Sequence, residues 1–306
     1  MNKKSCRCYL RIGDGIYSAD PLKTKKNVFM AMANMMMQLD REMCCVIHLN
    51  KEMTPISFNV CSIGTLNASL GGTRESYKAA LLDGAAYILF LHNHPSGDIT
   101  PSEADLGLTK KLIAAGRLIG VPLVDHIIVG YEDEKPLYGS VRGDYDKIWE
   151  MPEPVNPPHV LKEVEVRMKL KADFPGLYAK SPQMAALSLL PKIGGCGENE
   201  VIITVHDTKT KLLKVFRIPK DKAASKRTIQ RVMREAVVNN AAMIFLFTAD
   251  WPKLPSEKLI KSYSAAASLM DIRLVDAISI DQPQYRSAME EKSLPQVVQP
   301  DRERNR

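Results

Sequence analysis

Residues 85–105 read AAYILFLHNHPSGDITPSEAD, and the pattern changes at residue 92. The apolar run 85–91 is typical of a β-strand that is covered on both faces. A polar loop with one glycine and two prolines follows, and Ser102 then begins a helical pattern that continues to about residue 119. A buried strand that leads through a loop into a helix predicts an α/β layer fold. Such folds place their sites beyond the carboxyl ends of the strands.

Three candidate metal ligands follow this strand. His92 and His94 are two residues apart and therefore leave the strand on the same side. Asp105 lies in the first turn of the helix, where it can approach the same point. Two imidazoles and one carboxylate are the protein ligands of a catalytic zinc ion, which keeps a fourth position for a water whose pKa falls to about 7. Ser102-x-x-Asp105 is also a capping-box-like helix start, and that cap would fix the direction of Asp105.

The spacing His-x-His, seven residues, Ser-x-x-Asp resembles the motif of the JAMM (MPN+, or JAB) metalloproteases. The string HNHPSGDITPSEAD, the later LVDHIIVG at 123–130 and the stretch GTLNASLGGTRESYKAALLDGAA at 64–86 are similar to the RadC-like branch of that family. The resemblance covers residues 18–145. It implies one zinc ion per chain, held by His92, His94 and Asp105.

The resemblance also implies two catalytic residues. The family's serine, which helps to hold the oxyanion, corresponds to Ser102, and its upstream glutamate, the general acid/base, corresponds to Glu42. A base must take a proton from the attacking water and return it to the leaving amine. Glu75 is the competing candidate for the base, but we expect it in a helix away from the metal.

Other polar residues of the motif region have no implied catalytic role. Asp125 and His126 belong to the branch's signature; we favour strand-end packing for both over contact with the metal ligands. We expect His48 to be structural. RadC-like proteins often carry an N-terminal helix-hairpin-helix module that binds DNA, and the sequence before residue 18 is too short for one, which weakens a DNA role inferred from the family.

The two halves of the sequence resemble each other. Four collinear matches keep their order: 42–48 with 200–206, 85–91 with 241–247, 101–103 with 255–257, and 124–125 with 275–276. We interpret them as two copies of one domain, with chance similarity of short apolar strands as the alternative. The second copy has Thr248, Asp250 and Leu259 at the three ligand positions, and it retains Glu200 and Ser256. We therefore expect it to bind no metal.

The predicted fold class is α/β, with two tandem MPN/JAB-like (cytidine-deaminase-like) three-layer domains, mixed central sheets and a degenerate second domain. The expected boundaries are a catalytic RadC-like domain at 1–150 with its core at 18–145, a proline-rich linker at 151–160, a metal-free repeat at 161–285 and a flexible tail at 286–306. Four prolines in MPEPVNPPH, residues 151–159, place the linker.

Composition excludes several classes of protein. No apolar stretch approaches the roughly 20 residues of a membrane span, and we expect neither a signal peptide nor a membrane contact. The six cysteines form no C-x-x-C pair, as is usual in the cytoplasm, where we expect this protein. The net charge of +7 lies wholly after residue 150, because residues 1–150 contain 17 basic and 17 acidic side chains. This basic part could favour an acidic partner or nucleic acid, or be an ordinary solvated surface.

The favoured function is a zinc metallopeptidase that cleaves a peptide or isopeptide bond in a protein or peptide substrate. The alternatives are a DNA-associated protein or metal-dependent nuclease, and a module that uses zinc only structurally. A zinc deaminase is excluded because no P-C-x-x-C follows the histidines. Nucleic acid is not the favoured partner, since the basic stretch 209–234 has a single aromatic residue, Phe216, on which a base could stack.

Overall fold

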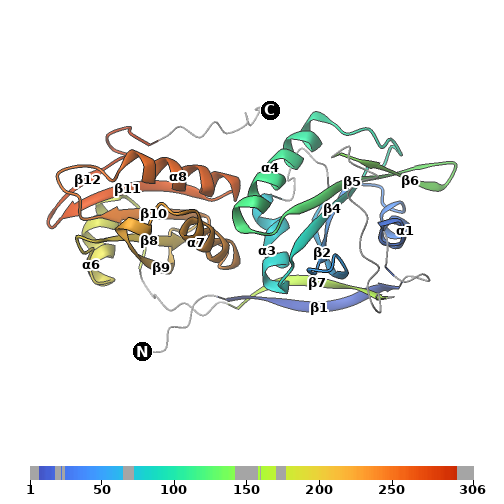
Figure 1. The fold of residues 1–306 in the computed structure, drawn as a ribbon, viewed down its shortest axis with the longest axis horizontal. Helices are drawn as coiled ribbons and strands as arrows, with labels where there is room; N and C mark the ends of the chain where they lie inside the picture. Colours follow the sequence, from blue (N-terminus) through green and yellow to red (C-terminus); the bar gives the residue numbers. More distant parts are fainter. Residues whose placement is uncertain are drawn as a thin grey trace. The chain divides into compact units, whose positions relative to one another are not determined.

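The computed structural model describes residues 7–17, 22, 25–64, 72–141, 158, 160–169 and 177–294. The chain divides into two compact units. The first is Arg7–Lys169, and the second is Leu170–Arg306 together with Met1–Cys6. Each unit contains its own sheet and its own hydrophobic core (Figure 1).

The first unit is built on a seven-stranded mixed sheet in the order β1-β7-β3-β2-β4-β5-β6. Its strands are β1 (Arg7–Tyr17), β2 (Met43–Leu49), β3 (Pro55–Ile63), β4 (Tyr87–Asn93), β5 (Leu123–Glu132), β6 (Lys135–Ser140) and β7 (Val160–Lys169). The parallel pairs are β4 with β5 and β3 with β7, and the other neighbours are antiparallel. The parallel β4–β5 pair requires a crossover connection, which the helix that follows the histidines supplies.

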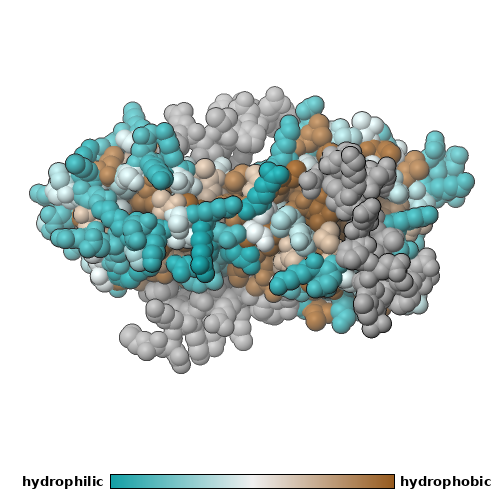
Figure 2. All heavy atoms as spheres, viewed as in Figure 1, coloured by the Kyte–Doolittle hydropathy of each residue, from teal (hydrophilic) through white to brown (hydrophobic). Residues whose placement is uncertain are grey.

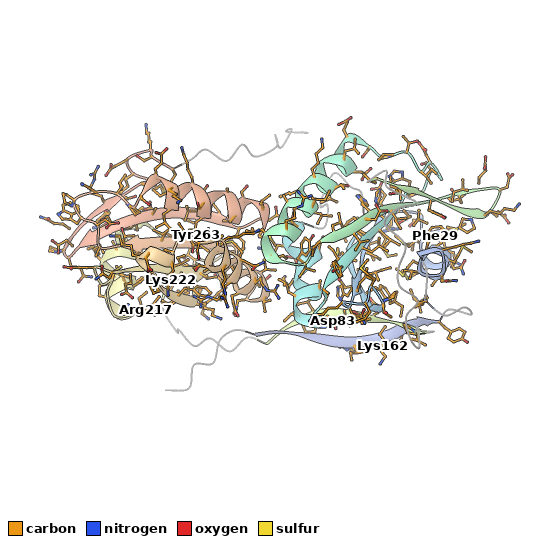
Figure 3. All side chains as sticks on the ribbon, viewed as in Figure 1. Phe29, Asp83, Lys162, Arg217, Lys222 and Tyr263 are labelled. Atoms are coloured by element: carbon orange, nitrogen blue, oxygen red, sulfur yellow. The ribbon has the colours of Figure 1, made fainter. Side chains whose placement is uncertain are left out.

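Helices cover both faces of this sheet. The helices of the unit are α1 (Lys25–Met36), α3 (Thr73–Asp83) and α4 (Glu103–Ile119). One face packs its side chains, among them Cys45, Ile47, Leu89 and Leu91, against apolar residues of α1 such as Phe29 (Figure 3). Because side chains alternate along a strand, the intervening residues, which include His92, lie on the other face with α3 and α4.

Helix α4 is held at both ends by capping residues. At its start the hydroxyl of Ser102 accepts the backbone N–H of Asp105, and the Asp105 carboxylate accepts the backbone N–H of Ser102, which completes a capping box. At its end Gly120 adopts φ +74°, the left-handed conformation that a glycine accepts without strain. The cap fixes the direction of the Asp105 side chain.

The second unit has a five-stranded mixed sheet in the order β12-β11-β10-β8-β9. Its elements are α5 (Pro182–Met184), η1 (Ala185–Leu189), α6 (Leu190–Lys192), β8 (Glu200–His206), β9 (Leu212–Pro219), η2 (Lys220–Lys222), α7 (Lys226–Val238), β10 (Met243–Thr248), α8 (Glu257–Leu269), β11 (Arg273–Asp281) and β12 (Gln284–Ser287). Residues of η1 and α6 pack on one face of the sheet, against Ile202, Phe245 and Ile278.

The two sheets share an order of five strands. In β3-β2-β4-β5-β6 and in β9-β8-β10-β11-β12 the one parallel pair occupies the same place. Register irregularities fall at matching points, between Ile88 and Leu89 in β4 and between Ile244 and Phe245 in β10. Asp125 accepts the Ser140 hydroxyl just as Asp276 accepts that of Ser287.

The match of Glu42 with Glu200 is wrong by one residue. Ile88 of β4 corresponds to Ile244 of β10. His48 pairs with Ile88, but His206 pairs with Met243, the residue before Ile244. After β3, the backbone N–H of Gly64 donates to the carbonyl of Glu42. At the matching place after β9, the backbone N–H of Lys220 donates to the carbonyl of Asn199. A shift of one residue places a side chain on the other face of a sheet, so Glu200 is not the counterpart of Glu42.

Two of the expected boundaries also require correction. Residues 160–169 form β7 and pair with β1 and β3, so the first unit extends to Lys169 rather than ending near residue 150. Residues 286–288 are not part of a flexible tail, since β12 includes Ser287 and the backbone N–H of Ala288 donates to the carbonyl of Ala277. Most of the predicted linker, 151–157 and 159, and residues 295–306 lie outside the described residues. Within the described part of the chain, no helix is long and apolar enough to cross a membrane.

Candidate metal centre

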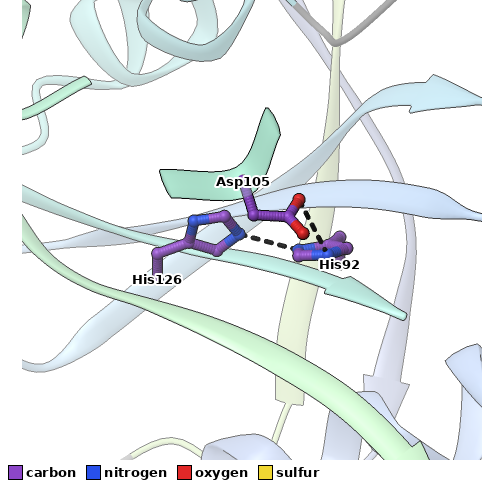
Figure 4. A group of neighbouring side chains, drawn as sticks. All are labelled: His92, Asp105 and His126. Carbon is purple, nitrogen blue, oxygen red and sulfur yellow. Dashed lines mark hydrogen bonds and ion pairs between the residues drawn. The ribbon is translucent and has the colours of Figure 1, made fainter. Parts of the chain in front are cut away.

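The candidate metal ligands come together at the carboxyl end of β4. His92, the last residue but one of this strand, lies on the α4 face, and Asp105 approaches from the first turn of α4 (Figure 4). Both side chains are completely buried, whereas His94, on the loop that follows, is partly exposed. A burial of this kind is costly for a carboxylate unless it is paired or coordinates a cation.

The donor atoms of three residues converge on one point. His92 Nε2 lies 2.9 Å from His94 Nε2 and 3.2 Å from Asp105 Oδ1, and His94 Nε2 lies 3.6 Å from Asp105 Oδ2. A tetrahedral zinc ion with bonds of about 2.0–2.1 Å separates its ligands by about 3.3 Å. Asp105 Oδ1 is buried and receives no hydrogen bond from the described residues. These three side chains therefore fit a divalent metal ion.

Hydrogen bonds fix which nitrogen of each imidazole faces this point. The hydroxyl of Thr109 donates to the carbonyl of Asp105 at 2.6 Å, so it accepts from His126 Nδ1 at 2.6 Å. His126 Nε2 then carries a lone pair and accepts from His92 Nδ1 at 2.7 Å. His94 Nδ1 donates to the carbonyl of Asp98 at 2.8 Å. Both histidines thus direct Nε2 toward Asp105, as metal ligation requires.

Electrostatics favour the neutral form of His92 and the ionised form of Asp105, the states that bind a metal. Burial lowers the pKa of His92 to about 4, against the opposing charge of Asp105, so this imidazole is neutral at pH 7. Burial alone would raise the pKa of Asp105, but the neighbouring His94, the hydrogen bonds from Ser102 and the charge of His92 outweigh it and lower that pKa. The adjacent carboxylate of Asp105 raises the pKa of His94.

His126 is a member of this cluster, which the sequence did not reveal. One ligand-type atom of each of His92, Asp105 and His126 lies within 4.8 Å of the others, and all three residues are buried (Figure 4). The expected strand-end packing was therefore incomplete, because His126 also contacts the candidate ligand His92. Because β4 and β5 are parallel and Phe90 pairs with His126, its side chain lies on the face of His92. The sequence does not show how β4 and β5 are aligned, so it could not place His126 beside His92.

The residues with implied catalytic roles lie around the same point. The Ser102 hydroxyl donates to Asp105 Oδ2 at 2.6 Å, so in this state it holds the carboxylate. Glu42 directly precedes β2, is half-buried, and raises the pKa of His94 through its charge. The rival base Glu75 lies on α3, where its carboxylate is paired with Arg74 at 3.0 Å and with Lys78 at 2.8 Å.

The second unit has different residues at the matching positions. Thr248 ends β10 as His92 nearly ends β4, Asp250 is paired with Lys220, and Leu259 lies in the first turn of α8. Among its described residues, no three His, Cys, Asp or Glu side chains form a cluster suited to a metal.

Comparison with known proteins finds similarity in one part of the first unit. Residues 22–143 match the family model of the RadC-like JAB domain. The UPF0758 protein of Methanosarcina mazei is 38% identical over 109 residues, 36% of this chain and 48% of that protein. The UPF0758 protein of Desulforamulus reducens is 48% identical over 92 residues, which are 30% of this chain and 40% of that protein. The UPF0758 protein of Methanococcoides burtonii is 34% identical over 118 residues, which are 38% of this chain and 52% of that protein. The chain spans about half the length of these relatives, and their names state no activity.

Proposed function

We propose that residues 22–143, which match the family model of the RadC-like JAB domain, form a zinc metallopeptidase that cleaves a peptide or isopeptide bond. The observation that carries the proposal is the convergence of His92 Nε2, His94 Nε2 and an Asp105 carboxylate oxygen that receives no hydrogen bond from the described residues. We assign the metal to these three residues rather than to His126, because the Nε2 of His126 is already bonded to His92.

Each residue of the site has a role in this proposal. A zinc ion at this point supplies an activated water at neutral pH. Glu42 takes a proton from the attacking water and returns it to the leaving amine. The hydroxyl of Ser102 donates a hydrogen bond to the developing oxyanion once it turns from Asp105 toward the substrate. His126 and Thr109 hold His92 in the tautomer that leaves Nε2 free.

We also propose that the second unit is a degenerate, metal-free copy of the JAB fold. Its support is the shared five-strand order, the matching register irregularities and the paired Asp125–Ser140 and Asp276–Ser287 bonds. Its role would be to present substrate to the active domain or to cover part of it.

The second candidate function is association with nucleic acid, and the charge of the second unit favours it. Hydrophilic side chains cover much of the visible face of this unit (Figure 2). Exposed basic residues of η2 and α7 are Lys220, which is paired with Asp250, and Lys222, Lys226, Arg227 and Arg231. Nucleic-acid binding through these residues would weaken steeply with salt, and a salt-insensitive or absent DNA affinity would remove this candidate.

Metal analysis and trapping test the main proposal. The purified chain should contain one zinc ion and not two, because the described residues of the second unit form no cluster suited to a metal. Glu42→Gln should retain the metal and lose hydrolysis, whereas His94→Ala should lose both. Proteins that co-purify with Glu42→Gln and not with His94→Ala are candidate substrates. Hydrolysis by Glu42→Gln at the wild-type rate would refute the assignment of the base.

A further inference from the structure

Asn93 lies between the two histidines and contacts the segment that carries Glu42. Its side chain is 2% exposed and lies on the α1 face of the sheet, opposite to that of His92. The backbone N–H of Met43 donates to Asn93 Oδ1 at 2.8 Å, and Asn93 Nδ2 donates to the carbonyl of Arg41 at 3.1 Å. The amide is therefore bonded to the backbone on both sides of Glu42, and the two partners fix which end is oxygen and which is nitrogen.

These bonds are made where β2 and β4 separate. Cys44 and His92 are the last paired residues of the two strands. The backbone N–H of His94 donates instead to the carbonyl of Val129 on β5, because the chain turns into the loop with the metal ligands. The Asn93 side chain provides the bond that the ladder no longer makes, so the N–H of Met43 is buried with a partner.

We infer that Asn93 is a positioning residue, which fixes the backbone around Glu42 and so sets where the Glu42 carboxylate lies relative to the metal ligands. The inference rests on the proposed function, since it takes Glu42 to act at the metal. The backbone carbonyl of Glu42 is also held, by the N–H of Gly64 at 2.9 Å. Three hydrogen bonds thus hold the three residues 41–43, and one side chain makes two of them.

Two further observations agree with this inference. Side chains alternate across a strand, so Glu42 extends to the face of Cys44 and His92 while Asn93 holds its backbone from the other face. In the second unit, Asn199 occupies the place of Glu42, and Ala249 follows Thr248 where Asn93 follows His92. The second unit therefore has neither the carboxylate at the position of Glu42 nor the amide at the position of Asn93.

The test uses the full chain loaded with Co²⁺, whose visible absorption responds to charge and geometry at the metal. The pH midpoint of this spectrum is measured for the wild type, Glu42→Gln and Asn93→Ala. We expect Asn93→Ala to bind Co²⁺ within threefold of the wild type. Its midpoint should move in the same direction as that of Glu42→Gln and at least half as far. The amide of Met43 should exchange its hydrogen at least tenfold faster.

Control variants separate positioning from general destabilisation. Asn59→Ala removes another buried asparagine, which contacts His48 and Cys61, and it should leave the midpoint unchanged. Asn93→Ser is smaller but polar; it decides the question if Asn93→Ala does not fold. A midpoint at the wild-type value for these Asn93 variants, with that of Glu42→Gln displaced, overturns this inference and leaves the proposed function standing. A wild-type midpoint for Glu42→Gln overturns both.

Discussion

Replacement of His126 should weaken metal binding although this residue is not assigned as a ligand. In His126→Ala, the Nδ1–H of His92 loses its acceptor at 2.7 Å inside a buried site. A buried donor without a partner costs about 1–3 kcal/mol, and loss of a ligand's outer partner typically costs 10–100-fold in metal affinity. The two ranges agree, so we expect the zinc dissociation constant to rise by about 10–100-fold.

The assay is a competition between the protein and a chromogenic chelator at pH 7.5. The matched control is His48→Ala, which removes a histidine that is equally buried but bonded to Asp83 and Asn59. It should lower the free energy of unfolding and leave the zinc affinity unchanged. Thr109→Val, which removes the acceptor for His126 Nδ1, should give a smaller loss of affinity than His126→Ala.

Two results would refute this reasoning in different ways. A zinc affinity of His126→Ala within threefold of the wild type would mean that the orientation of His92 does not depend on His126. A loss of more than about a thousandfold exceeds what an outer partner contributes. It would make His126 itself a ligand, in the set His92, Asp105 and His126.

Further predictions concern both units. Burial lowers the pKa of His206 to about 4 against about 6.5 when unfolded, so the unfolded state binds more protons between these values. Stability is then complete above pH 6.5 and falls by about 3 kcal/mol as the pH drops to 4; urea unfolding should show this slope, and His206→Asn should reduce it. The buried hydroxyl of Thr248 finds no hydrogen-bond partner among the described residues. Thr248→Val should therefore raise the free energy of unfolding by about 1 kcal/mol, measured as a higher Tm. A lower Tm would contradict this prediction. A Cβ at Gly130 would lie 2.1 Å from the carbonyl oxygen of Gly97. Gly130→Ala should therefore displace the loop that carries His94 and weaken zinc binding in the same chelator assay. A wild-type zinc affinity would show that the loop accommodates the methyl group without moving His94.

The local elements could be predicted from the sequence because their signals are local. The apolar run before His92 forms β4, and the Ser102 cap begins α4 as expected. The positions of the metal-ligand candidates follow from these two elements, since a strand end and a helix start fix three side chains within 14 residues. The resemblance to the RadC-like branch is confirmed for residues 22–143.

The missed features all depend on contacts between distant segments. Strand β1 pairs with β7 across about 150 residues, and no periodicity in either strand indicates the other. His126 and Asn93 act through the registers of β4 with β5 and with β2. The error of one residue at Glu200 has the same origin, because similar apolar strands can be aligned at neighbouring positions and only the hydrogen-bond ladder distinguishes them.

The pairing of β1 with β7 has a consequence for how the first unit is synthesised and truncated. Arg7 lies opposite Lys169, so the sheet is complete only after nearly the whole unit has left the ribosome. Closing so long a loop is slow, and until then β1 and β3 present unpaired edges. A fragment that ends at residue 150, the boundary suggested by the sequence, would lack β7, and its unpaired strand edges would remain available for aggregation. Recombinant fragments of the first unit should therefore extend through Lys169.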